Sequence, residues 1–434
     1  MRTGERFRRI RLSLLVFVAA ATTFASAQTN TAPPEAPEHK AESLWTRKTL
    51  TGDWGGARPA LEDKGVSLRL FYNQQGQKNF RGGLDTHSGQ RLSGSYDLHL
   101  LLDFGKMGLW NDAGFFMEAK GTWSVGINPA KVGALFNVNA DAGDNHVIFV
   151  KKWWYWQKFL DKKLEVRLGM LETNKDLFDV SPYANHEDKD FINRGSIRNA
   201  TIPHRTGIGA FAKVQPIEWL YVQAGAVDAN SEDRRIGFDT AFHEPDWYVG
   251  LVETGVTPKW KSAKGPMPGN VRVGVWYDPR PKALFTDTLG GSRDAGKRAD
   301  DMGYYVGVDQ LIWKENAEEK DTQGLGVFAR YGHAHQDANQ IADYWSVGAS
   351  YRGLIPTRDA DVTGLAVSQG ILSERYGDEI HPRADRETAH EWYYAYQLAP
   401  WCVISPHAQV VVNPGGDKDS TDAIVGGVRI RFTF

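Results

Sequence analysis

The feature that most constrains this chain is a strict alternation of apolar and polar side chains, repeated in segment after segment. Val271, Val273 and Val275, for example, share one parity, while Arg272 and Asp278 occupy the other. A period of two places the apolar side chains on one face of an extended strand and the polar ones on the opposite face. The same pattern occurs at 66–73, 96–104, 115–124, 164–170, 325–331 and 345–352. The sequence therefore predicts an all-β chain whose strands separate an apolar environment from a charged one.

Composition indicates which apolar environment these strands face. The mean hydropathy is -0.45, and no run after the N-terminus reaches the roughly 18 apolar residues of a membrane helix. Aromatic residues (15 Trp, 16 Tyr and 20 Phe) recur at the ends of the apolar faces, where the girdle of a membrane barrel lies. A soluble antiparallel sheet also alternates, but here nearly every segment does so. We predict a transmembrane antiparallel up-and-down β-barrel, whose strands show lipid only alternate side chains.

The last segment, 424–434, is the sharpest local example of the alternation. Ile430, Phe432 and Phe434 share one face, and Arg429 and Arg431 lie on the other. A final amphipathic strand that ends in phenylalanine resembles the signal by which the barrel assembly machinery recognises outer-membrane barrels. We expect this strand to engage that machinery, and the finished barrel to contact the lipid and lipopolysaccharide of the outer membrane.

The N-terminus predicts export. Five arginines within residues 2–11 precede an apolar run at 12–21, and small residues at 25–27 supply a cleavage site. This order is typical of a secretory signal peptide, and the run is too short for a membrane anchor. We assign residues 1–27 to the signal peptide, the proline-containing segment 28–49 to a flexible periplasmic leader, and 50–434 to the barrel domain. A short helix is expected within 53–64, at the periplasmic mouth.

Charge and cysteine content exclude two other classes of protein. The chain has 51 lysines and arginines against 53 aspartates and glutamates, which leaves no basic footprint for nucleic acid. Cys402 is the only cysteine, so the chain forms no intramolecular disulfide. An exported chain of this size must then be stabilised by its core or by a medium other than water.

A series of motifs resembles one known family along most of the chain. The motifs are 50–58 (LTGDWGGAR), 101–110 (LLDFGKMGLW), 167–178 (RLGMLETNKDLF), 391–394 (EWYY), 398–401 (LAPW), 406–409 (PHAQ) and 413–416 (NPGG). In order and spacing they are similar to the OprB-type carbohydrate-selective porin family over about residues 50–434. The resemblance implies sixteen strands, a constriction loop folded into the barrel, and facilitated diffusion of sugars, glucose-like monosaccharides first, across the outer membrane of a Gram-negative bacterium. It implies no cofactor, no metal and no catalysis.

Sugar hydroxyls both donate and accept hydrogen bonds, so a sugar-selective pore calls for mixed charged and amide side chains on its inner wall. The candidate lining residues are Arg69, Arg91, Asp97, His99, Glu118, Lys120, Asn174 and Asp176. The resemblance places Arg91, Glu118 and the segment 172–178 nearest the eyelet, and it makes 179–198 the inward loop. Any one of these residues has an alternative interpretation as an ordinary solvated wall residue.

Other functions remain open at this point. A general diffusion porin without sugar preference would show the same strands. The close pair His333 and His335 would suit a metal-dependent enzyme, but no third ligand is fixed by spacing and we favour solvated loop histidines. A secreted β-sandwich lectin would leave the final strand unexplained. The aromatic run 153–156 is either a stacking surface for sugars or, as we favour, interfacial packing.

Overall fold

The computed structural model describes residues 42–143, 146–184, 189–232, 234–285, 297–318, 321–379 and 383–434. The predicted signal peptide and most of the predicted leader lie outside these ranges. Residues 42–434 form one compact unit built mainly of strands. In the described part of the chain, no helix is long and apolar enough to cross a membrane.

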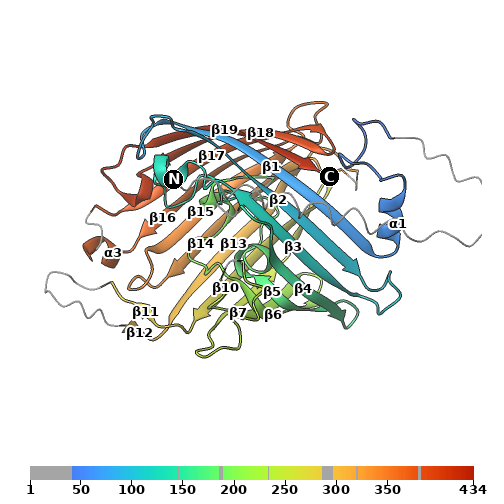
Figure 1. Cartoon of the computed structure of the whole chain (residues 1–434), viewed down its shortest axis with the longest axis horizontal. Helices are drawn as coiled ribbons and strands as arrows, with labels where there is room; N and C mark the ends of the chain where they lie inside the picture. The colour runs from blue at the N-terminus through green and yellow to red at the C-terminus, as the bar shows by residue number, and fades with distance from the viewer. Residues whose placement is uncertain are drawn as a thin grey trace, which may run out of the picture. The chain divides into compact units, whose positions relative to one another are not determined.

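Sixteen long strands of the described chain form one closed antiparallel sheet (Figure 1). Each pairs with the long strand before it and the one after it, and the last pairs with the first, with Phe432 opposite Tyr72. The strands are β1 (Val66–Arg81), β2 (Gln90–Asp103), β3 (Ala113–Trp123), β4 (Phe149–Phe159), β5 (Leu164–Glu172), β6 (Thr206–Ile217), β7 (Leu220–Asp228), β8 (Tyr248–Val256), β10 (Gly265–Asp278), β13 (Asp301–Lys314), β14 (Gly324–Ala334), β15 (Ile341–Arg352), β16 (Val362–Leu372), β17 (Arg386–Ala399), β18 (Cys402–Val412) and β19 (Ala423–Thr433). The predicted sixteen-stranded barrel is confirmed.

Shorter strands, helices and turns lie at the ends of the barrel and in the connections between the long strands. Strand β9 (Lys259–Ser262) forms a hairpin with the start of β10, and β11 (Lys282–Ala283) pairs with β12 (Lys297–Arg298). The helices are α1 (Ala57–Asp63), α2 (Arg194–Ile197) and α3 (Glu374–Glu379), with short turns η2 (Asn128–Val132), η3 (Thr173–Leu177) and η5 (Pro414–Gly416). One end carries α1, the C-terminus and short turns, which in membrane barrels is the periplasmic end.

Side-chain burial on the wall is the reverse of that in a soluble protein. On β10, Val273 and Val275 are 46% and 53% exposed, while the neighbouring Arg272 and Trp276 are 1% and 2% exposed. The alternation therefore places the apolar parity outside and the charged parity inside. This is the arrangement of a barrel whose outer face meets lipid.

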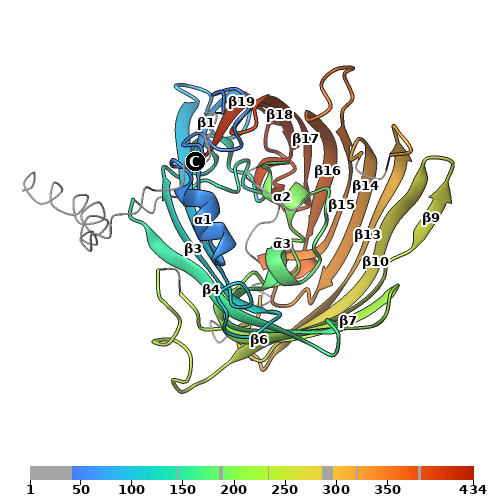
Figure 2. The ribbon, with the colours of Figure 1, turned by 90° about the vertical axis from the view of Figure 1, so that its right-hand side faces the viewer.

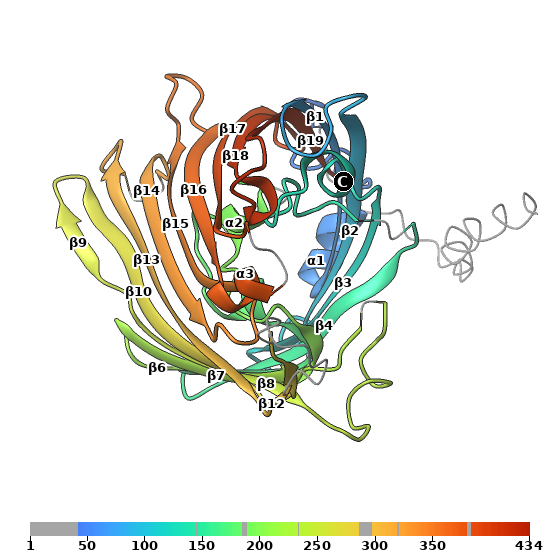
Figure 3. The same cartoon turned by 90° about the vertical axis from the view of Figure 1, so that its left-hand side faces the viewer.

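Two long connections at the end opposite α1 fold into the barrel (Figures 2 and 3). The first joins β3 to β4 and contains η2, and the second joins β5 to β6 and contains η3 and α2. The second packs aromatic residues on the inner wall: Phe178 meets Phe211 edge to face at 5.8 Å, and Phe191 meets Tyr393 at 4.9 Å. The expected inward loop, 179–198, is the middle of this second connection.

A third connection folds over the outside of the barrel instead. We call residues 234–243, between β7 and β8, the outer flap. Its Ala241 is 1% exposed and packs with Met170 and Ile208 on the outer face, and its Phe238 stacks on Trp153 at 5.6 Å. Nothing in the sequence predicted this contact, because it joins an irregular segment to the lipid-facing parity of β4, β5 and β6.

At the periplasmic mouth, the segment before β1 contacts the C-terminal end of the chain. Helix α1 confirms the helix expected within 53–64, and its Arg58 donates to the Phe434 carbonyl at 3.2 Å while lying 4.2 Å from the Trp54 ring centre. Leu50 donates its backbone N–H to the Thr433 carbonyl at 2.7 Å. The Leu44 carbonyl, within the predicted leader, accepts from the Trp401 indole at 2.7 Å.

Candidate functional site

The strand register places oppositely charged side chains of the inner wall in directly facing positions. Asp97 on β2 faces Lys120 on β3, His99 faces Glu118, and Glu118 faces Lys152 on β4. Opposite charges in directly facing positions of an antiparallel pair stabilise each other. The inner parity of three adjacent strands thus forms a ladder of ion pairs that runs along the lumen.

The upper part of the ladder is completed by the β3–β4 connection. The Lys120 ammonium lies 3.2 Å from an Asp97 oxygen and 2.6 Å from an Asp141 oxygen, and Asp141 also accepts from the Ser95 hydroxyl at 2.5 Å. Asp141 belongs to the inward connection, so this ion pair ties that loop to the wall. It also compensates the charge of Asp141.

The lower part of the ladder centres on Lys152, which is 3% exposed. Its ammonium lies 3.2 Å from Glu118, 2.9 Å from Glu172 and 2.6 Å from Asp176. Removing a charge from water costs several kcal/mol unless partners surround it. The three carboxylates supply those partners, and His99 adds a contact to Glu118 at 3.5 Å.

Six of the eight predicted lining residues lie together in this region. Asp97, Lys120, His99, Glu118 and Asp176 belong to the ladder, and Asn174 in η3 donates to the Asn199 carbonyl at 2.8 Å. All lie on β2, on β3 or at the start of the second inward connection. Whether they line the conducting path stays a prediction.

The other two predicted residues lie at opposite ends of the barrel. Arg69 shares the inner parity of β1 but stands at the periplasmic mouth, in a cavity of about 410 Å³ with Arg58 and Glu62 of α1. Arg91 is exposed at the far end of β2, and its guanidinium donates to the carbonyls of Ser88 and Gln90 at 3.0 and 2.8 Å. The structure does not bring either residue into the ladder.

Two residues beside the ladder, Lys151 and Glu172, do not follow from the alternation, although the family resemblance placed Glu172 in the segment 172–178 nearest the eyelet. By alternation Glu172 belongs on the outer face with Met170, but β5 ends there and the chain turns inward at η3. The β3–β4 register shifts between Glu118 and Ala119, so that the adjacent lysines Lys151 and Lys152 both reach Glu172, at 3.7 and 2.9 Å. A bulge and a strand end both break the period of two.

A basic stretch that begins in α2 is the second feature that the alternation did not predict. Residues 194–205 contain Arg194, Arg198, His204 and Arg205 and no acidic residue, a signal present in the sequence. The four line a cavity of about 340 Å³ and also one of about 390 Å³, so they stand between the two. Burial, followed by the charge of Arg198 at 2.9 Å, holds the pKa of His204 well below its ordinary value.

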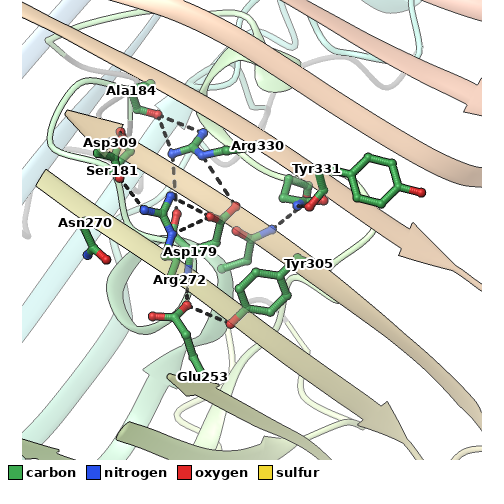
Figure 4. A network of polar contacts seen from close by, with 12 residues as sticks. Asp179, Ser181, Ala184, Glu253, Asn270, Arg272, Tyr305, Asp309, Arg330 and Tyr331 are labelled. Carbon is green, nitrogen blue, oxygen red and sulfur yellow. Dashed lines mark hydrogen bonds and ion pairs between the residues drawn. The ribbon is translucent and has the colours of Figure 1, made fainter. Parts of the chain in front are cut away.

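A second network fixes the inward loop to the opposite wall (Figure 4). Asp179 of the loop accepts from the Nε of Arg272 on β10 at 2.8 Å and lies 3.5 Å from the Arg330 guanidinium of β14. Arg272 also pairs with Asp309 of β13. All four side chains are at most 2% exposed.

The same loop is anchored through its backbone to carboxylates on two strands, β8 and β17. The Asp179 N–H donates to Glu253 of β8 at 2.8 Å, and the Ile192 N–H donates to Glu391 of β17 at 2.6 Å. Glu387, also on β17, accepts from the backbone N–H of Phe136 in the first inward connection at 2.8 Å. Both connections are therefore held in place by charge-assisted hydrogen bonds to the wall.

The histidine pair considered for an enzyme lies apart from the ladder. His333 pairs with Asp343 at 2.9 Å, and His335 lies 2.8 Å from the Arg298 guanidinium. Within the described ranges, no group of three His, Cys, Asp or Glu side chains is arranged to hold a metal ion. In the aromatic run, Trp153 packs outside the barrel and Trp154 packs with the inner cluster, as alternation requires.

Comparisons with known proteins agree with this geometry. The family model described as "Carbohydrate-selective porin, OprB family" matches residues 88–434. Porin B of Pseudomonas aeruginosa is 23% identical over 431 residues, covering 91% of this chain and 94% of that protein. The putative porin QuiX of Acinetobacter baylyi is 22% identical over 437 residues, covering 91% and 95%.

Solved structures show the same barrel. The high-pH structure of Pseudomonas putida OprB gives a TM-score of 0.79 at 22% identity, covering 91% of this chain and all of that one. Its low-pH structure gives a TM-score of 0.56 at 19% identity, covering 90% and 99%. At these identities the likeness concerns the fold.

Proposed function

Because the chain belongs to the OprB family of carbohydrate-selective porins, we propose that its polar lumen passes glucose-like monosaccharides by facilitated diffusion, with the ion-pair ladder as the sugar-contacting wall. The protein is an outer-membrane porin of a Gram-negative bacterium and not an enzyme. The finer statements, which concern the sugar and the residues that it touches, are supported by the chemistry of the lumen.

The observation that carries the proposal is the pairing of nearly every charge on the ladder. Lys120 is compensated by Asp97 and Asp141, and Lys152 by Glu118 and its neighbours. A hydroxyl that passes such a wall meets donors and acceptors at short intervals, but no uncompensated charge that would hold it tightly. Weak, repeated binding is what a conducting pore requires, because a tight site traps the solute.

A general diffusion porin is the second candidate. It would conduct sugars, amino acids and ions according to size and charge, without saturation by sugar. The two functions differ in one measurable property, a saturable sugar block of the ionic current.

The test is single-channel conductance of the purified protein in a planar bilayer, titrated with glucose, other sugars and a size-matched amino acid. Saturable block by sugars and none by the amino acid supports the proposal. Current without sugar block would demote the protein to a general porin. Lys120→Gln should weaken the block, because it removes a donor and leaves Asp141 uncompensated. Arg91→Ala tests the eyelet position implied by the family: unchanged conductance and block would remove Arg91 from the constriction.

We also infer that residues 1–27 are removed on export and that β19 engages the barrel assembly machinery. The terminal Phe434 donates its N–H to the Leu70 carbonyl of β1 at 2.9 Å, so the last residue lies at the seam where the barrel closes. The exposed apolar parity of the wall is suited to outer-membrane lipid and lipopolysaccharide.

A further inference from the structure

A continuous line of aromatic side chains crosses the inner wall on four adjacent strands. Its members are Phe71 on β1, His99 on β2, Phe116 on β3 and Trp154 on β4, and we call them the inner arc. Each ring contacts the next: the ring centres are 5.1 Å apart for Phe71 and His99, 5.4 Å for His99 and Phe116, and 4.4 Å for Phe116 and Trp154. The inner arc is therefore one packed surface of rings.

Two arginines contact the end rings of the inner arc. The guanidinium of Arg431 on β19 lies 4.4 Å from the ring centre of Phe71, and that of Arg167 on β5 lies 5.7 Å from the ring centre of Trp154. Cation–π contacts of this kind stabilise the positions of both rings. Arg167 is also paired with Glu165 at 2.7 Å, so hydrogen-bond donors and acceptors lie next to the rings.

These aromatic side chains have the parity that faces the lumen. Phe116 shares its face of β3 with Glu118, and Trp154 shares its face of β4 with Lys152. The aromatic girdle of a membrane barrel lies on the opposite, lipid-facing side. Phe71, Phe116 and Trp154 are half-buried, so each keeps part of its apolar surface exposed on a wall that is otherwise charged. A contiguous apolar surface with a polar rim is typical of a ligand-binding groove.

The inner arc lies one inward-facing position closer to the periplasm than the ladder. On β3, Phe116 precedes Glu118 by two residues, and on β4, Trp154 follows Lys152 by two. Two residues of a strand span about 7 Å. His99 belongs to both surfaces, because it contacts Glu118 at 3.5 Å and the Phe116 ring. A solute that leaves the ladder toward the periplasm therefore meets the inner arc next.

On its periplasmic side the inner arc borders the cavity of about 410 Å³ at the mouth of the barrel. Phe71 lines this cavity together with Arg69 and with Glu62 of α1. A guanidinium and a carboxylate supply donors and acceptors for hydroxyl groups. The rings thus lie between two polar regions, the ladder and the cavity.

We propose that the inner arc binds the apolar face of a pyranose ring, so that the channel favours ring-form sugars over open-chain polyols of similar size. This inference rests on the proposed sugar-channel function and deepens it. A pyranose presents C–H groups on its ring face and hydroxyls around its rim, which matches a row of rings between two polar regions. An open-chain polyol has the hydroxyls but no flat apolar face. Of the aromatic run 153–156, Trp154 then contacts sugar, while Trp153 packs outside the barrel.

The size of the preference follows from the area that one ring covers. Covering roughly 40 Å² of apolar surface favours binding about fivefold. That is enough to select a solute and too little to trap it. The preference should persist as salt rises, because apolar contact, unlike a charge interaction, is not screened.

The test compares glucose with sorbitol, its open-chain alditol, as blockers of the current through single channels. We expect glucose to block at a concentration about fivefold lower than sorbitol, in 0.1 M and in 1 M KCl alike. Phe116→Leu should reduce this ratio at least about twofold, because leucine keeps the apolar bulk but has no flat ring. Trp154→Leu should act in the same way and serves as the second variant if the first does not fold.

Phe115→Leu is the matched control. Phe115 directly precedes Phe116 in the chain, but it lies on the lipid-facing parity of β3 and stacks with Trp153, with ring centres 6.3 Å apart. The ratio should survive this variant, and Trp153→Leu provides the same control for Trp154→Leu. Equal loss in Phe115→Leu and Phe116→Leu would assign the effect to a general disturbance of β3 and overturn the site.

The remaining outcomes separate the two proposals. Equal block by glucose and sorbitol in the native channel overturns this inference and keeps the sugar-channel function. A ratio that disappears in 1 M KCl, or that both inner variants leave unchanged, also overturns it, because the preference would then arise from charges or from another part of the lumen. If neither solute blocks the current, the proposed function itself fails, and this inference fails with it.

Discussion

Replacing Arg272 by methionine removes the central cation of the network that anchors the inward loop. Its guanidinium lies 2.7 Å from Asp179 of the loop and also pairs with Asp309 of β13, and its side chain is fully buried. Methionine keeps most of the volume of the arginine stem but supplies no charge. Among the described residues, Asp179 would then keep Arg330, at 3.5 Å, as its ion-pair partner, and Asp309 would keep the hydroxyl of Ser181.

The expected cost is large because both carboxylates stay buried. Breaking a buried ion pair by removing one partner costs about 3–5 kcal/mol. The double variant Arg272→Met with Asp309→Asn removes one charge of each sign and leaves Asp179 paired with Arg330. It should therefore lose less stability than the single variant, although it carries more changes.

The assay is guanidinium titration of the barrel refolded in lipid vesicles, read by tryptophan fluorescence, together with single-channel recording. The single variant should show a loss of about 3–5 kcal/mol in the free energy of unfolding and a noisier current, because the loop is released from β10. A loss below about 1 kcal/mol in the single variant would refute the reasoning, as would a double variant that costs the sum of the two single substitutions.

Three further predictions concern other parts of the chain. Ala241→Glu places a carboxylate in the apolar contact with Met170 and should detach the outer flap, seen as faster trypsin cleavage within it while the barrel stays folded; an unchanged cleavage rate contradicts the packing. The lowered pKa of His204 means that the unfolded chain binds a proton first as pH falls below about 6.5, so stability should drop there less in His204→Gln than in the native protein, and equal pH profiles would exclude this role. Phe434→Ser should slow barrel insertion in cells without changing the conductance of channels that do insert, and a normal yield would remove the terminal residue from recognition.

The β-barrel could be predicted from the sequence because one physical rule applies to all strands of the wall. Strands that face lipid on one side and water on the other must alternate, and Val271 to Asp278 follows that rule except at Trp276, which has the inner parity and packs in the inner cluster. Rules of this kind give the face of a side chain but not its height in the barrel. Arg69 and Arg91 have the inner parity, yet they stand at the two mouths.

The site was harder to predict where the alternation breaks. Glu172 turns inward only because β5 ends at that residue, and Lys151 reaches the cluster only because of the bulge in β4. Neither departure leaves a mark in the spacing of apolar residues. Arg198 and Arg205, by contrast, lie in a stretch without acidic residues, and that local charge imbalance could have singled them out. The outer flap depends on tertiary contacts alone.

The most direct test of the account is a comparison of solute entry into proteoliposomes that contain the purified protein. Swelling rates should be measured for glucose, for a second neutral hexose and for an amino acid of similar size. We predict faster, saturable entry of the sugars, with saturation weakened in Lys120→Gln. Equal, non-saturating entry of all three solutes would contradict the claim that the ion-pair ladder makes this barrel a sugar channel.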